Sequence, residues 1–144
     1  MRFSIFFAIF LTACGPDVTA WKGTWTGSGT LNTGRLPEPY TGTLTIADGA
    51  RFELSVPSSG TTFTCAINAA TVDGTTATFT VPASCTMTAT PSDGCTYQVT
   101  VNAASATRTA DTIEGTANGR VNSTCTSSSS KATDFALTLF GTRK

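Results

Sequence analysis

The sequence predicts an all-β protein, an antiparallel up-and-down β-barrel of eight or nine strands over residues 21–144. Three features lead to this prediction. Apolar and polar residues alternate with a period of two along most of the chain, as in strands that bury one face. Short turns containing Gly, Asp and Pro separate the alternating segments. Threonine, a β-branched residue that favours strands, makes up about a fifth of the chain.

The alternation places the strands in order. The expected strands are 21–31, 43–46, 51–56, 62–67, 76–81, 85–90, 95–101, 113–125 and 135–143. Tight turns are expected at Asp48-Gly49, Asp73-Gly74 and Pro91 to Gly94, and loops at 32–39, 104–110 and 126–131. No segment of useful length has the period of a helix.

Antiparallel strands with one apolar face can bury it by packing two sheets together or by closing one sheet on itself. Closure also removes exposed sheet edges. Eight strands enclose an interior just wide enough to be filled by side chains or to hold one small ligand. The sequence therefore favours a barrel, with a β-sandwich as the alternative.

The first thirteen residues have the layout of a secretory signal peptide, with Arg2, an apolar run over 3–11 and small residues before a cleavage point. The run is too short to span a bilayer. Leu11-Thr12-Ala13-Cys14 resembles the lipobox of bacterial lipoproteins. The resemblance implies cleavage after Ala13, lipid on Cys14 and a tether over 14–20. An ordinary cleaved signal peptide is the alternative.

The same resemblance implies a location and a partner. A lipid-bearing Cys14 would hold the protein on a membrane of the bacterial envelope, because several acyl chains anchor durably where a single chain does not. Gly15, rather than an aspartate, follows Cys14 and implies the outer membrane. The formal net charge is zero, with no run of either sign, so no nucleic-acid surface is expected.

The four remaining cysteines are Cys65, Cys85, Cys95 and Cys125. An even number of cysteines in an exported chain predicts two disulfides. The predicted hairpins bring Cys65 near Cys85 and Cys95 near Cys125, although the pairing of 85 with 95 and of 65 with 125 stays open. A zinc site is not expected, because the chain has no histidine and no C-x-x-C pair.

Gly23-Thr24-Trp25 matches the G-x-W with which lipocalins, and similarly avidins, begin their barrels. This resemblance to lipocalins implies that Trp25 plugs one barrel end and that an arginine of a late strand packs across it. Arg143 is in phase with the inward residues of the last strand and could stack on Trp25. A core tryptophan with Arg143 loose at the terminus is the alternative.

Catalysis and cofactor binding are not expected. No histidine is present to act as acid or base, and the acidic residues fall mostly at turns or at outward positions. Two functions remain. The first is a passive envelope protein with a filled barrel that contacts other surface components, and the sequence favours it because packed interiors are the default. The alternative is a module that binds a small apolar ligand in the lumen. The sequence names no protein partner.

Overall fold

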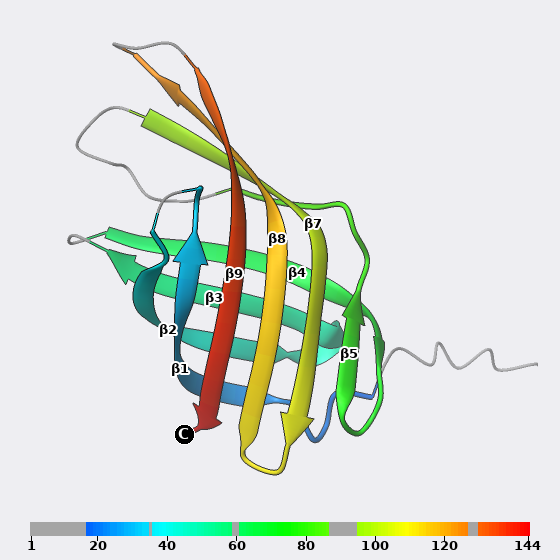
Figure 1. Ribbon diagram of the computed structural model, residues 1–144. Coiled ribbons are helices and arrows are strands. Elements are labelled where there is room, and N and C mark those ends of the chain that lie inside the picture. Colours follow the sequence, from blue (N-terminus) through cyan, green and yellow to red (C-terminus); the bar gives the residue numbers. More distant parts are fainter. Residues whose placement is uncertain (1–16, 35, 59–60, 87–94, 127–129) are drawn as a thin grey trace, which may run out of the picture.

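The computed structural model describes residues 17–34, 36–58, 61–86, 95–126 and 130–144. In this part of the chain nine strands form one antiparallel sheet (Figure 1). They are β1 (Gly23–Asn32), β2 (Glu38–Ala47), β3 (Arg51–Ser58), β4 (Thr61–Val72), β5 (Thr76–Phe79), β6 (Ala83–Thr86), β7 (Cys95–Thr109), β8 (Thr112–Cys125) and β9 (Lys131–Arg143). A 3-10 turn, η1 (Asp48–Ala50), joins β2 to β3. The described residues include no helix long and apolar enough to cross a membrane.

The sheet closes on itself because β5 pairs with β4 on one side and with β7 on the other. From β5 the order of paired strands is β5-β4-β3-β2-β1-β9-β8-β7, and the pairing of Ala77 with Ala106 returns to β5. Eight strands therefore form a closed antiparallel barrel, and the predicted barrel is confirmed in preference to a sandwich. The remaining strand, β6, pairs with another part of β7.

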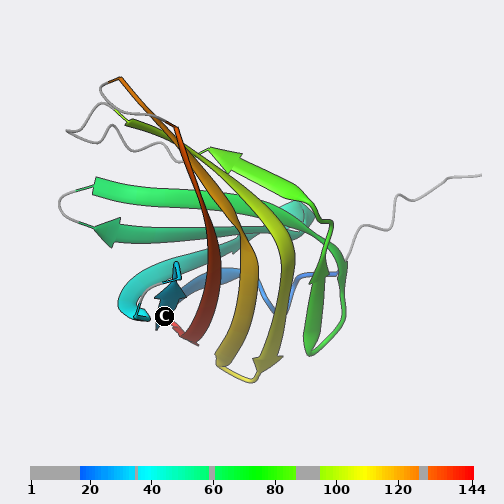
Figure 2. The same cartoon turned by 45° about the horizontal axis from the view of Figure 1, so that its top comes forward.

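The strands differ in length, so the barrel is taller on one side. Figures 1 and 2 show the ends of β7, β8 and β9 near residues 95, 125 and 131 projecting beyond β1 and β2. At the opposite end β9 finishes beside the start of β1, where Arg143 is the register partner of Trp25. The register thus distinguishes two barrel ends, one at Trp25 and the other at the projecting strands.

Strand β7 is longer than expected. The sequence predicts a loop over 104–110, but β7 continues to Thr109 and the turn lies at 110–111. The register of β7 against β8 shifts between Val101 and Ala103. This irregularity interrupts the alternation, because Val101 is buried before it and Ala106 after it. A prediction that requires strict alternation of buried and exposed residues therefore ends this strand too early.

Two other strand limits also differ from the expectation. Strand β1 begins at Gly23, and Trp21 lies in a preceding turn, where its amide donates to the Val18 carbonyl at 2.8 Å. Val18, assigned to the tether on sequence grounds, is buried against the barrel. Strand β5 ends at Phe79, short of the expected limit. Pro82, which has no amide hydrogen to contribute to a ladder, lies between β5 and β6.

The two disulfides are Cys65–Cys85 and Cys95–Cys125, with Cα separations of 5.1 and 4.0 Å. Both expected pairings are confirmed. Cys95 and Cys125 are register partners in the β7–β8 hairpin. The Cys65–Cys85 bond instead joins β4 to β6, which the described register pairs with β7 and not with β4.

Buried apolar residues form two clusters in the described part of the chain. The larger consists of Val18, Trp21, Trp25, Leu44, Ile46, Ala50, Phe52, Ala69, Ala77, Ala106, Ile113 and Leu139. The smaller consists of Cys85, Val99, Val101 and Phe135. The larger cluster contains both tryptophans, so the best-packed part of the barrel is the end at Trp25.

Candidate functional site

Two tryptophans fill the barrel end at the start of β1. The side chains of Trp21 and Trp25 are completely buried. The indole N–H of Trp25 donates to the Trp21 carbonyl, and that of Trp21 donates to the Asp73 carbonyl, both at 2.9 Å. Trp21 also packs edge-on against Phe52, with ring centroids 5.8 Å apart. Both indoles are therefore held in place with their polar atoms satisfied.

An arginine lies against each tryptophan. The guanidinium carbon of Arg143 is 4.7 Å from the ring centroid of Trp25, and the same side chain donates to the Ala20 carbonyl. The contact expected between Trp25 and Arg143 is thus present. Arg108 lies 5.9 Å from the ring centroid of Trp21. Such cation–π contacts add electrostatic attraction to the packing of the rings.

Sequence reasoning missed Arg108. Its guanidinium donates to the carbonyls of Ala110 and Gly74 at 2.9 and 2.8 Å and so connects two turns at this end. Arg108 follows Ala104 and Ala106 at intervals of two residues, and this phase would have placed it inside. The irregularity after Val101 concealed that phase.

The turn between β4 and β5 is fixed by the side chain of Asp73. Its carboxylate accepts hydrogen bonds from the amides of Thr75 and Thr76 at 2.8 and 2.6 Å. These bonds hold the pKa of Asp73 below its ordinary value. Because the Asp73 carbonyl accepts from Trp21, the turn also helps to keep the barrel end closed.

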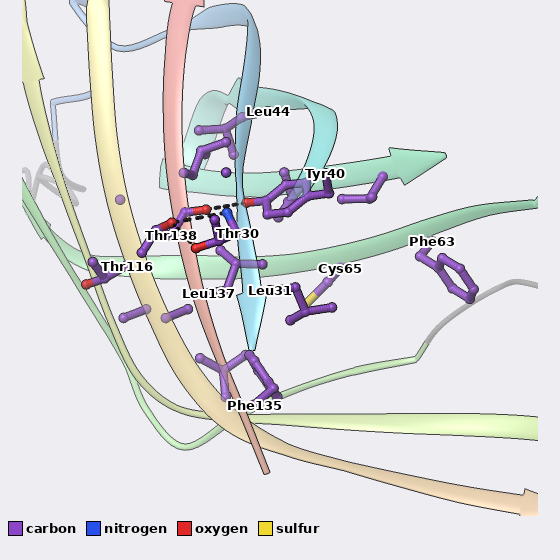
Figure 3. A pocket seen from close by; sticks show the side chains of 18 of the residues that line it. Thr30, Leu31, Tyr40, Leu44, Phe63, Cys65, Thr116, Phe135, Leu137 and Thr138 are labelled. Atoms are coloured by element: carbon purple, nitrogen blue, oxygen red, sulfur yellow. Dashed lines mark hydrogen bonds between the residues drawn. The ribbon is translucent and has the colours of Figure 1, made fainter. Parts of the chain in front are cut away.

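A cavity of about 1670 Å³ occupies the barrel beyond the tryptophans. Apolar residues of several strands line it, among them Leu31, Leu44, Leu54, Phe63, Ile67, Val99, Phe135 and Leu137. Figure 3 shows Leu31, Leu137 and Phe135 on one side of this space and Phe63 on the other. The tryptophans and both inward arginines are absent from its lining. The cavity is therefore apolar and separate from the charged groups at the closed end.

Several aromatic residues that could have filled the barrel stand around the cavity instead. Phe52 and Phe135 are buried, whereas Phe63, Phe79 and Tyr97 are only partly buried and line the space. Met87, two residues after Cys85 in the strand expected over 85–90, lies outside the described residues. The aromatic side chains thus form a wall with room between them.

Two glycines of β1, Gly27 and Gly29, lie where this strand runs close to β9, and Gly29 lines the cavity. A Cβ at Gly29 would collide with the carbonyl oxygen of Thr138, and one at Gly27 would lie 2.5 Å from the carbonyl oxygen of Phe140. Strands β1 and β9 therefore approach too closely for any side chain at these positions. The same close approach brings the Thr138 carbonyl within reach of the lumen.

Tyr40 is the polar group that the structure adds to the expected site. It is half-buried on β2, its ring lies next to Gly29, and its hydroxyl donates to the Thr138 carbonyl at 2.7 Å (Figure 3). Burial raises the pKa of Tyr40 to about 12. Its alternation with Leu44 and Ile46 could have identified it, but the expected strand began only after residue 40.

Charge is nearly absent from the cavity. The charged residues that line it are Glu38, Glu114 and Lys131, and all three are exposed. Glu38 and Lys131 begin β2 and β9, at the end away from Trp25. Among the described residues, no group of histidine, cysteine or acidic side chains could hold a metal ion. Cys14, the expected lipidation site, lies outside the described residues.

No protein-family profile matches this chain, and no curated protein matches it. Among solved structures, a similar protein is a member of the DUF3598 family, of unknown function, from Nostoc punctiforme. It is 16% identical, with a TM-score of 0.34, and the alignment covers 90% of this chain and 49% of that one. This chain therefore spans about half the length of that protein.

Proposed function

We propose that this protein binds a small apolar molecule in the barrel cavity. The observation that carries the proposal is a cavity of about 1670 Å³ with a mostly apolar lining. Ligand sites in proteins are commonly apolar clefts of about 300–1,000 Å³ with a few placed polar groups. This cavity exceeds that range, and the partly buried Tyr40 and Tyr97 are among its lining residues.

The cavity favours ligand binding over the passive role that the sequence had favoured. That role assumed a barrel filled by its own aromatic side chains. Phe63 and Phe79 instead remain partly exposed to the cavity. Contact between apolar cavity walls and water is unfavourable, and an apolar ligand in the cavity would replace that water. The proposal is of binding without catalysis, since the exposed Glu38, Glu114 and Lys131 are the charged residues of the lining.

Uptake of Nile red, an uncharged dye that brightens in apolar surroundings, tests this function. We expect saturable brightening with the purified, disulfide-bonded protein in detergent-free buffer, reversed by an excess of a competing alkane, sterol or quinone. Ala117 faces the cavity from β8 and Asn122 faces outward on the same strand. Ala117→Phe should weaken uptake while Asn122→Phe leaves it unchanged. An absence of saturable uptake would instead support the passive envelope role.

We also propose that lipid on Cys14 anchors the protein to a bacterial membrane. The support is the Leu11-Thr12-Ala13-Cys14 tetrad after a short apolar run. In a bacterial host, the wild-type chain should appear in the membrane fraction with added lipid mass at Cys14, and Cys14→Ser should lose both. Wild-type protein without lipid mass, or a Cys14→Ser chain still cleaved after Ala13, would contradict the anchor.

A further inference from the structure

The lining of the cavity excludes one class of ligand on electrostatic grounds. An ionised group in an apolar site loses its hydration and is strongly disfavoured unless a charged or hydrogen-bonding partner compensates for the loss. Arg143 and Arg108 lie against the tryptophans at the closed end, where they donate to backbone carbonyls, and neither lines the cavity. The three ion pairs of the described residues, Lys22–Asp48, Arg51–Glu53 and Arg120–Asp134, lie outside the cavity lining. The charged residues of the lining are Glu38, Glu114 and Lys131, and all three are exposed. The lining thus offers no buried cation to pair with an anionic ligand.

The hydroxyl of Tyr40 on the cavity wall has a defined hydrogen-bonding capacity. A tyrosine hydroxyl has one proton to donate and an oxygen that can accept. The proton of Tyr40 is directed to the Thr138 carbonyl at 2.7 Å. The phenolic oxygen keeps its acceptor capacity, and the hydroxyl is protonated at neutral pH, since burial raises the pKa of Tyr40 above its ordinary value to about 12. A ligand that approaches Tyr40 must therefore bring a donor of its own.

The position of Tyr40 sets the orientation of such a ligand. Tyr40 pairs with Gly29, four residues from Trp25 along β1 and therefore nearer to the closed end than Leu31 is. The apolar lining continues from there toward the projecting strands through Leu31 and Phe135. A ligand whose polar group meets Tyr40 would thus have its apolar body on the side of the open end.

We propose that the cavity selects an uncharged apolar alcohol, which enters hydroxyl first and donates a hydrogen bond to the phenolic oxygen of Tyr40. This inference rests on the proposed binding function and specifies its ligand. A ketone of the same shape has an acceptor where the site requires a donor. A sulfate ester of the same alcohol introduces a charge that the interior cannot pair.

Cholestanol, cholestanone and cholestanol sulfate provide matched probes for competition against Nile red. For the wild-type protein we expect the alcohol to bind about fivefold more tightly than the ketone, the effect of one neutral hydrogen bond. The sulfate should bind more weakly than either. Tyr40→Phe removes the acceptor and should bring the alcohol-to-ketone ratio close to one, with ketone affinity within about twofold of wild type.

Tyr97→Phe is the matched control, because Tyr97 also lines the cavity and is the other tyrosine of the chain. It should leave the preference for the alcohol intact. Equal wild-type binding of alcohol and ketone, or tighter binding of the sulfate, would overturn the inference while leaving the binding function in place. Failure of Nile red and all three probes to bind would instead overturn the binding function itself. The wild-type ratio decides the matter even if Tyr40→Phe does not fold.

Discussion

Trp25 joins three parts of the barrel end through one side chain. Its indole donates to the Trp21 carbonyl in the turn before β1, and Arg143 from β9 lies over its ring. Arg143 in turn donates to the Ala20 carbonyl of that turn. The N-terminal turn, the first strand and the last strand are thus connected where the chain closes the barrel.

Replacement of Trp25 should show how much this arrangement contributes to stability. Trp25→Ala removes a fully buried ring and should lower the free energy of unfolding by about 3–5 kcal/mol. Arg143→Ala should cost about 0.5–2 kcal/mol through the lost cation–π contact. Urea denaturation measures both. Arg51→Ala, which breaks an exposed ion pair with Glu53, is the control and should change stability by less than about 1 kcal/mol.

A loss for Trp25→Ala no larger than that for Arg51→Ala would contradict the structural role of the ring. The double variant tests whether the two side chains act together. If its loss in free energy of unfolding equals the sum of the losses for Trp25→Ala and Arg143→Ala, the side chains do not cooperate, because residues in contact normally deviate from additivity.

At the scale of single elements, β6 differs from the other strands in how it is attached. Its described register pairs Ala83 with Val101 and Cys85 with Val99 on β7. On its other side, the link to β4 is the Cys65–Cys85 disulfide. This part of the wall therefore combines a hydrogen-bonded ladder on one side with a covalent bond on the other.

Replacing both cysteines of one disulfide at a time should reveal this difference. The double change Cys65→Ser with Cys85→Ser should lower the free energy of unfolding by about 2–4 kcal/mol, chiefly because the disulfide no longer restricts the unfolded chain. It should also accelerate amide hydrogen exchange in β6, because the ladder to β7 is its remaining attachment. Amide hydrogen exchange measured residue by residue would report the protection of β6 and, for the control variant, that of β8.

The matched control is Cys95→Ser with Cys125→Ser. These cysteines are register partners within the long β7–β8 ladder, so β8 should keep its protection except near Cys125. Equal loss of protection in β6 and β8, or none in β6, would contradict a special role for the Cys65–Cys85 bond.

Over the whole molecule, local chemistry made much of the fold predictable. Alternation located the strands, Asp-Gly pairs located two turns, and cysteines flanking the predicted hairpins gave both disulfides. The contact between Trp25 and Arg143 was expected from the resemblance of Gly23-Thr24-Trp25 to lipocalins, with Arg143 chosen by its inward phase, and the register places the two residues opposite one another. The strands, turns and disulfides depend on the alternation of residues and on hairpin geometry, and both can be recognised in short stretches of sequence.

Features that depend on strands far apart in the sequence were harder to predict from the sequence. The pairing of β5 with β7 closes the sheet between strands that are not neighbours in the sequence, and the irregularity near Ala103 hid the phase of Arg108. The sequence left open whether the barrel is filled or holds a cavity, since the volume of the lumen depends on strand tilt and stagger around the whole barrel. Tyr40 became a candidate only when β2 proved to begin at Glu38.

The glycines of the inner wall have an evolutionary consequence. At Gly27, Gly29 and Gly119 a new side chain would strike the backbone of a neighbouring strand, so mutation there disrupts the fold before it narrows the lumen. At Gly115 a Cβ would find only ordinary contacts, the nearest at 3.5 Å. Selection for folding alone thus keeps side chains out of these positions, whether or not the cavity binds a ligand. Gly115 lines the cavity and is where a substitution could begin to fill it.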